Sequence, residues 1–194
     1  MRSILPLLIT ASLHNIGSVT AQMCGADACG TTVVPFWRSF STGAVDHFYT
    51  ASTIEFLNAA NNFSYFPEGV ATGVFDIQEG ASVPLFRLNN VVLQDHFYTT
   101  NTTERDQFIA AGYTLEGTAA WVYADGICGS HPLFRLFNLK QVDHFYTTSG
   151  PELNAALAQG YQSEGIAAFV PAVGIVTEAE VTCLGPGSVG LSST

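Results

Sequence analysis

Positive charge is scarce in this chain. Its 194 residues include only 6 lysines and arginines against 16 aspartates and glutamates, which gives a formal net charge of −10 at pH 7. Binding to DNA, to RNA or to an anionic membrane surface requires clustered lysine and arginine, so we expect no nucleic-acid partner and no membrane partner. The composition suits a partner that is neutral or cationic, such as an uncharged polysaccharide.

The motifs of common enzymes and of membrane spans are also missing. The chain contains no GxSxG elbow, no HExxH helix and no glycine-rich phosphate loop. No stretch beyond the N-terminal segment is long and apolar enough to form a membrane helix. We therefore expect a protein that is not an enzyme and uses no cofactor, with a secreted hydrolase whose site is assembled between repeats as a less favoured reading.

Cysteine is sparse, but its number is even. The four cysteines are Cys24, Cys29, Cys128 and Cys183. No CxxC pair occurs, which argues against a zinc ribbon or a redox motif and favours paired disulfides. Four cysteines allow three connectivities, and the spacing does not choose among them.

The N-terminal segment predicts export. Arg2 precedes the mostly apolar run 4–13, and the small residues Val19 to Ala21 suit a cleavage site. Residues 1–21 are therefore predicted to be a signal peptide of a secreted, extracellular protein, with a buried N-terminal helix as the alternative. Asn62 and Asn101 each begin an Asn-x-Ser/Thr triplet, so both are candidate glycosylation sites.

One unit recurs three times along the chain. The string Asp-His-Phe-Tyr-Thr begins at Asp46, Asp95 and Asp143, so the periods are 49 and 48 residues. A Pro-x-x-Arg motif precedes each string, and a Glu-Gly pair follows it. The ungapped alignment of 84–123 with 132–171 contains 21 identities in 40 positions. Such a period indicates a repeat architecture.

Local signals predict the same elements in each copy. In the second copy, 84–88 and 95–100 are aromatic-rich and flanked by turn residues, which predicts two strands of a hairpin. Asn101 begins a capping-box pattern that predicts a short helix, and Gly112 suits the left-handed residue after its end. The apolar run 118–123 predicts a third strand. The equivalent helix caps are Ser52 and Ser149, and the equivalent glycine in the third copy is Gly160.

We predict a mainly β fold with short helices (α+β), built from three strand-strand-helix-strand repeats. One unit cannot bury its apolar face alone, so the three are expected to pack around a common core. A closed pseudo-threefold arrangement, like a propeller or a trefoil, would leave no exposed sheet edge. The single domain is predicted to span residues 22–184, with repeats at about 35–80, 84–127 and 132–171, a closing strand at 175–183 and a flexible tail at 185–194.

These repeats resemble a family of secreted fungal and bacterial proteins catalogued as a domain of unknown function. The resemblance covers residues 35–171 and depends on the Pro-Leu-aromatic-Arg, Asp-His-Phe-Tyr-Thr-Thr and Glu-Gly motifs. In bacteria, similar repeats are attached to secreted cell-wall hydrolases, which implies a targeting or binding role. The first copy departs most from the pattern, with Phe36-Trp37 in place of Leu-Phe, Ala51 in place of the second threonine and Gly73 in place of an aromatic residue.

The repeated charged residues form a predicted structural network. In each strand, Asp and Phe share one face, and the Phe is expected to point to the core. A buried carboxylate needs a charged partner, and arginine is the cation that recurs with it. We therefore predict an Arg–Asp pair in each hairpin. The network consists of Arg38, Arg87, Arg135, Asp46, Asp95, Asp143, Glu68, Glu116 and Glu164.

The opposite face of the same strand is the candidate binding surface. It carries a histidine and a tyrosine, which would place an aromatic ring beside hydrogen-bonding groups, as saccharide recognition requires. The candidate binding residues are His47, Tyr49, His96, Tyr98, His144 and Tyr146, with Trp37 and Trp121 extending the surface. Core aromatics are the alternative reading. A zinc site would also be possible if the three histidines met at the axis, although we expect no metal.

The favoured function is a secreted, non-enzymatic module that binds glycan or cell-wall polymer through several weak sites. The alternative is a structural or self-associating extracellular protein whose repeated polar residues only hold the fold. Burial distinguishes the two, because a binding surface requires that the repeated histidines and tyrosines line solvent-open clefts.

Overall fold

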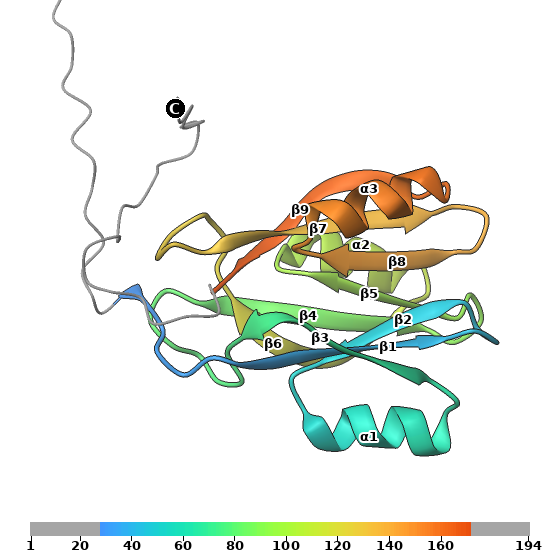
Figure 1. Cartoon of the computed structure of the whole chain (residues 1–194), viewed down its shortest axis with the longest axis horizontal. Helices are drawn as coiled ribbons and strands as arrows, with labels where there is room; N and C mark the ends of the chain where they lie inside the picture. Colours follow the sequence, from blue (N-terminus) through green and yellow to red (C-terminus); the bar gives the residue numbers. More distant parts are fainter. Residues whose placement is uncertain (1–27, 172–194) are drawn as a thin grey trace, which may run out of the picture.

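The computed structural model describes residues 28–171, which form a mainly β protein with three short helices, as predicted. The elements follow the predicted order of strand, strand, helix and strand three times (Figure 1). Unit 1 contains β1 (Val34–Ser41), β2 (Asp46–Thr50), α1 (Thr53–Asn62) and β3 (Phe66–Val74); unit 2 contains β4 (Val83–Asn90), β5 (Asp95–Thr99), α2 (Thr102–Ala110) and β6 (Thr114–Val122); unit 3 contains β7 (His131–Asn138), β8 (Asp143–Thr147), α3 (Gly150–Ala158) and β9 (Gln162–Val170). The signal peptide, closing strand and tail predicted from the sequence lie outside the described residues.

Each unit forms its own antiparallel sheet of three strands with its first strand in the middle, in the orders β2-β1-β3, β5-β4-β6 and β8-β7-β9. The described strands form no closed barrel. Isolated bridges join Phe75 to Trp121 and Tyr123 to Phe169, which link unit 1 to unit 2 and unit 2 to unit 3. Among the described residues, no helix is long and apolar enough to cross a membrane.

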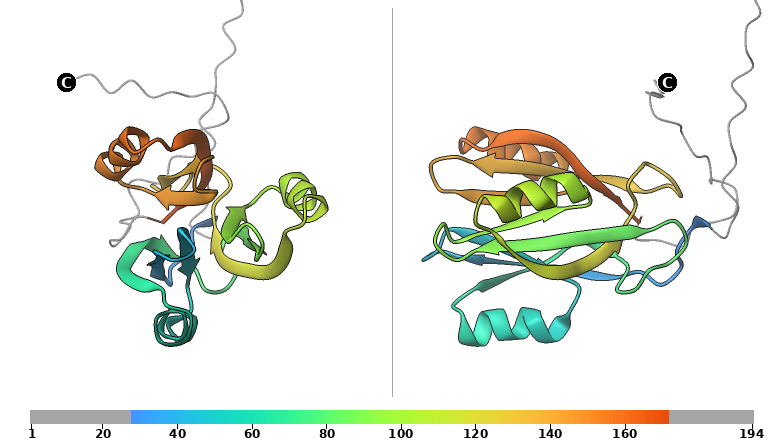
Figure 2. Two further views of the ribbon diagram at one scale, coloured as in Figure 1. Left: turned by 90° about the vertical axis from the view of Figure 1, so that its right-hand side faces the viewer. Right: turned by 180° about the vertical axis from the view of Figure 1, so that it is seen from behind.

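The three sheets surround a common centre, and the helices lie on the outside (Figure 2). The strands β2, β5 and β8 contact one another in all three pairings. We call the line between these three strands the central axis. All five residues of each of the three strands are buried. The prediction of one exposed face on this strand is therefore wrong, because neighbouring units cover the face that the sheet leaves open.

Local chemistry explains where each helix begins and ends. The side chains of Ser52, Asn101 and Ser149 cap the three helices by accepting hydrogen bonds from backbone N–H groups of the first turn. Gly112 and Gly160 follow the helix ends with φ values of +97° and +95°, as predicted for a left-handed residue. In unit 1, Ser64 occupies the corresponding place with a φ of +59°.

The main core contains residues from all three units. Each unit contributes one buried side chain from its first strand and one from its second strand. Alanine and valine residues of the third strands complete the core. Its buried members are Phe36, Tyr49, Val74, Leu85, Tyr98, Ala120, Val122, Leu133, Tyr146, Ala168 and Val170. Because no unit encloses this core alone, the free energy of folding depends on contacts between units.

Candidate functional site

The three repeated tyrosines form a ring at the central axis. Tyr49, Tyr98 and Tyr146 are 0–1% exposed, and their ring centroids lie 5.3–5.5 Å apart in edge-to-face pairs. The Tyr98 hydroxyl donates to the Tyr49 carbonyl at 2.9 Å and accepts from the Tyr49 N–H at 2.8 Å. The other two hydroxyls repeat this arrangement around the axis.

The prediction that these tyrosines offer an exposed binding surface is therefore wrong. Each phenol hydroxyl forms hydrogen bonds with both the N–H and the C=O of a tyrosine in another unit. These buried backbone groups are therefore satisfied without water. Complete burial raises the pKa of all three tyrosines well above 10.0. These side chains thus hold the units together as neutral hydrogen-bonding groups.

The repeated aspartates and histidines form a second ring of contacts between units. Asp95 accepts from the backbone N–H of His144 at 3.0 Å, and its Oδ2 lies 2.8 Å from His144 Nδ1. The Tyr113 hydroxyl, from the same unit as Asp95, also donates to that carboxylate at 2.6 Å. In the same way, Asp46 of unit 1 pairs with His96 of unit 2, and Asp143 of unit 3 pairs with His47 of unit 1.

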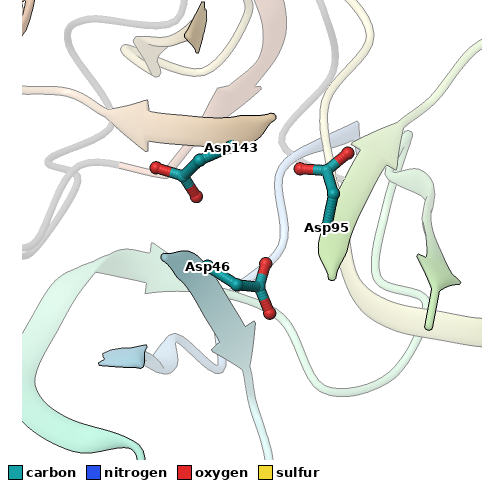
Figure 3. A group of neighbouring side chains, drawn as sticks. All are labelled: Asp46, Asp95 and Asp143. Carbon is teal, nitrogen blue, oxygen red and sulfur yellow. The ribbon is translucent and has the colours of Figure 1, made fainter. Parts of the chain in front are cut away.

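The aspartates also approach one another at the axis. Figure 3 shows that Asp46, Asp95 and Asp143, from β2, β5 and β8, lie around a common centre. Each carboxylate is turned toward the histidine of another unit. One carboxylate oxygen from each aspartate lies within 4.8 Å of the other two. Among the residues that the structure describes, these three are therefore close enough together to hold a metal ion. The three imidazoles do not take this place, which contradicts the zinc hypothesis, because each Nδ1 is turned to an aspartate of another unit.

Asp46 shows how a buried carboxylate remains charged here. Burial acts to raise the pKa of Asp46, but the hydrogen bonds from His96 and Tyr65 act in the opposite direction, and the resulting pKa lies below the usual value of 3.8. The donors of the neighbouring unit therefore compensate for the lost water. Because these donors already surround the carboxylates, the trio needs no ion to balance its hydrogen bonds.

The predicted Arg–Asp pairs are absent from the described hairpins. The strand register places Arg38 opposite Tyr49 and Ser41 opposite Asp46, so the arginine and the aspartate are three positions apart on the hairpin. Arg38 instead forms an ion pair with Glu68 of its own unit, at 2.7 Å, and a bidentate pair with Glu152 of unit 3, at 2.9 and 3.2 Å. The pairing was mispredicted because the distance along the chain does not specify the register.

The other two arginines repeat this bridge between two glutamates. Arg87 contacts Glu116 of its own unit and Glu55 of unit 1, and Arg135 contacts Glu164 and the helix glutamate of unit 2. The hydrogen bond from Arg87 lowers the pKa of Glu55 from 4.5, with burial acting in the opposite direction. The arginine of each unit therefore pairs with a helix glutamate of another unit, and these helix glutamates are Glu55, Glu104 and Glu152.

Each arginine also lies over a phenylalanine of the neighbouring unit. The Arg87 guanidinium carbon is 4.9 Å from the centroid of the Phe48 ring, and the two other units show 4.8 and 5.1 Å. We call the contact between unit 1 and unit 2 seam 1–2, and the other two seam 2–3 and seam 3–1. The repeated residues thus build three similar seams from a cation–π contact, an Arg–Glu bridge and an Asp–His pair.

Two seams are hollowed at the protein surface. A hollow of about 400 Å³ at seam 1–2 is lined by Phe48, Tyr65, Arg87, His96 and the strongly exposed Phe63. A smaller hollow of about 220 Å³ at seam 3–1 has the equivalent floor of phenylalanine, histidine, arginine and glutamate. Two of the three histidines predicted for binding, His47 and His96, therefore line these hollows, although they are only 9% and 8% exposed.

Several lining residues were missed because they are not repeated. Phe63 is 68% exposed and follows α1 directly, where unit 1 has one residue more than the other units before its tyrosine. The sequence signal was available: Asn-Asn-Phe-Ser-Tyr replaces the Ala-x-Gly-Tyr of units 2 and 3. Repetition does not mark a residue that only one unit carries.

The predicted tryptophans do not extend the hollows. Trp37 stacks on Phe56 of α1 with ring centroids 4.9 Å apart, inside unit 1. Trp121 packs against the cluster around Phe75 and Tyr123. Both are half-buried, because a helix or another unit covers the strands on which they lie, and neither lines a hollow, so the prediction that they enlarge a binding surface is wrong.

The remaining predicted residues are divided between described and undescribed parts. Cys29 and Cys128 form a disulfide across 99 residues with a Cα–Cα distance of 5.6 Å, while Cys24 and Cys183 lie outside the described residues. Asn62 and Asn101 are both exposed, and Asn101 also caps α2. Glycosylation of either asparagine stays a prediction.

Fold and site together define a class of three-unit β protein whose repeated polar residues connect the units. Residues 35–171 match the family model described as Domain of unknown function (DUF5648). The chain belongs to this family. No curated protein and no solved structure matches it.

Proposed function

We propose that the protein is a secreted, non-enzymatic module that binds glycan or cell-wall polymer in the hollows at its seams. The observation that carries this proposal is the composition of the hollow at seam 1–2. It combines aromatic surface from Phe48 and Phe63 with charged and amide groups from Arg87, Glu116 and Asn89.

This combination suits a saccharide ring. The C–H face of a sugar packs on an aromatic side chain, while its hydroxyl groups exchange hydrogen bonds with planar charged groups and amides. Arg87 and Glu116 are held 2.6 Å apart by their ion pair, so they are already oriented before a ligand arrives. Such preorganisation reduces the entropic cost of binding.

A binding role fits the proposed setting of the protein. We place it outside the cell, with residues 1–21 as a removable signal peptide, and the disulfide between Cys29 and Cys128 supports an oxidising compartment. We further propose that the three units form a closed pseudo-threefold assembly. The cyclic tyrosine and Asp–His contacts support this arrangement, since each joins unit 3 back to unit 1.

A pull-down with insoluble polysaccharides tests the proposal. The mature protein is expected to be retained by a neutral polymer, chosen from cellulose, chitin, β-1,3-glucan and mannan, and to be released by soluble fragments of that polymer. Anionic pectin serves as the negative control, because the protein carries a net charge of −10. The proposal is wrong if folded protein is retained by none of the four neutral polymers.

The second candidate is a structural or self-associating extracellular protein. The specific observation in its favour is that the repeated tyrosines, aspartates and arginines are all engaged in contacts between units. Sedimentation velocity over a wide concentration range tests this alternative. Self-association in the absence of glycan, together with failed retention on polymers, would favour it.

A further inference from the structure

The three seams differ at one helix position, and this difference decides which of them can hold a ligand. The residue four positions after the helix glutamate is Ala59 in unit 1, Phe108 in unit 2 and Ala156 in unit 3. Both alanines line the hollows of their seams. The phenylalanine occupies the equivalent space at seam 2–3.

Phe108 closes seam 2–3 by stacking on the wall of that seam. Its ring lies parallel to Phe97 at a centroid distance of 3.6 Å and meets the His144 ring at 6.0 Å. As a result, Phe97 is 0% exposed and His144 is 3% exposed, whereas their seam 1–2 equivalents Phe48 and His96 are both 8% exposed. The protein thus fills one seam with its own aromatic ring at the place where an alanine leaves the others open.

Seam 1–2 has a second hollow that extends the first. This hollow of about 380 Å³ shares Glu55, Arg87 and Glu116 with its neighbour, so the two meet at the Arg–Glu bridge. Ala51 lines it in place of the second threonine of the motif. At seam 2–3, by contrast, the hydroxyl of the equivalent Thr100 donates to the Ala167 carbonyl at 3.3 Å, which ties the two units together.

We infer that seam 1–2 is the principal binding groove, that seam 3–1 is an auxiliary site, and that seam 2–3 takes no ligand because Phe108 fills it. This inference rests on the proposed function and adds the position and the shape of its site. Each of the two hollows at seam 1–2 falls within the usual size range of small-ligand sites, about 300–1,000 Å³. Together they suit consecutive rings of a linear glycan that crosses the Arg87 bridge.

The charges of the groove select the class of glycan. Glu55, Glu116 and Asp76 line it against the single cation Arg87, and His96 borders one hollow. An anionic ligand would therefore meet an excess of carboxylates and be repelled. The groove is suited to uncharged chains such as β-linked glucose or N-acetylglucosamine, and it excludes uronic-acid and sulfated chains.

Aromatic substitutions at the helix position test the inference. The probes are the hexasaccharides of β-1,4-linked N-acetylglucosamine, β-1,4-linked glucose and β-1,3-linked glucose, measured by titration calorimetry with the folded mature protein. Ala59→Phe is expected to lower the affinity by at least about tenfold, because the added ring should stack on Phe48 as Phe108 does on Phe97. Ala156→Phe should remove only the auxiliary site and lower the stoichiometry.

Two further variants complete the comparison. Asn61→Phe places the same ring on the exposed side of α1, outside the hollows, and should leave binding unchanged. Phe108→Ala empties seam 2–3 and should raise the stoichiometry without weakening the first site. Thermal unfolding of each variant shows that the fold is retained before its binding is interpreted.

The outcomes separate the two proposals. Binding by the wild type that survives Ala59→Phe would overturn the assignment of seam 1–2 and leave the proposed function standing. Absence of binding by the wild type to all three probes and to all four insoluble polymers would overturn the proposed function, and this inference with it. Loss of binding by Ala59→Phe but not by Asn61→Phe supports both.

Discussion

The axial part of the molecule and its outer seams follow opposite rules. At the axis the three units are alike: Tyr49, Tyr98 and Tyr146 make the same hydrogen bonds, and the Asp–His pairs repeat around the centre. At the surface of the seams the units differ, with an alanine or a phenylalanine at one helix position. Repetition marks the residues that hold the units together, and departure from it marks the residues that shape the surface.

This contrast reverses a natural interpretation of the sequence. Copy one deviates most from the shared pattern, which makes any repeated site in it the least certain. In the structure, the deviating Ala51 lines one hollow at seam 1–2, and Phe63, a further departure of the first copy, lines the other. A unit that is released from the repeat pattern at its surface can acquire a site that the other units lack.

The axis should be the part most sensitive to mutation. Tyr98→Ala is expected to destabilise the protein by about 4 kcal/mol, because it removes a fully buried ring and leaves both backbone groups of Tyr49 unpaired. Urea unfolding measures the change. Tyr98→Phe, which keeps the ring, should cost clearly less; an effect of Tyr98→Ala below about 1 kcal/mol would contradict the description of the axis as the stabilising core.

The Asp–His contacts should come next in size. Asp95→Ala is expected to cost about 3 kcal/mol, because His144 and Tyr113 would lose a buried, hydrogen-bonded partner. Thermal and urea unfolding test this loss. Asp106→Ala is the control, since Asp106 is exposed and pairs with the adjacent Arg105, and a surface pair is worth at most about 1 kcal/mol. If both substitutions lower the free energy of unfolding by the same amount, the Asp95 contacts are worth no more than a surface ion pair, and the prediction is wrong.

The Arg–Glu bridges should have a smaller, pH-dependent effect. Glu55 has a pKa lowered from 4.5 in the folded protein, so its contribution to stability is present above pH 4.5 and is lost as the pH falls through the lowered pKa. Arg87→Met removes this contribution. Because the bridge is partly exposed, the substitution should cost only about 1 kcal/mol at neutral pH. The cost should become smaller toward pH 3, because Glu55 takes up a proton and the ion pair is lost. Urea unfolding of both proteins between pH 3 and pH 7 tests the sign; a constant difference would rule out the linkage.

The surface of the seam should tolerate mutation best and affect binding most. Phe63→Ser is expected to change the free energy of unfolding by less than about 0.5 kcal/mol, because its side chain is 68% exposed, but to weaken retention on the polymer. Val92→Ser, at an 86% exposed position outside the hollows, is the matched control. If both variants bind like the wild type, Phe63 is only an exposed residue of the loop.

Much of the local structure was predictable from the sequence. The helix caps Ser52, Asn101 and Ser149 and the left-handed Gly112 and Gly160 depend on interactions within a few residues, so their short motifs indicate them directly. The threefold order of elements followed from the period of 48 and 49 residues. These predictions succeeded because each one concerns neighbours in the chain.

The sequence by itself therefore determined the elements, their order and the set of polar residues that the three units share. Only the tertiary structure decided the partners of those residues: Asp95 pairs with His144 at 49 residues' distance, and Arg87 with Glu55 at 32. Strand periodicity distinguishes the two faces of a strand, but it does not reveal that another unit covers the outer face. The tyrosines became an internal ring, and Phe108 closed one seam, because the packing of whole units around the axis sets which surfaces meet.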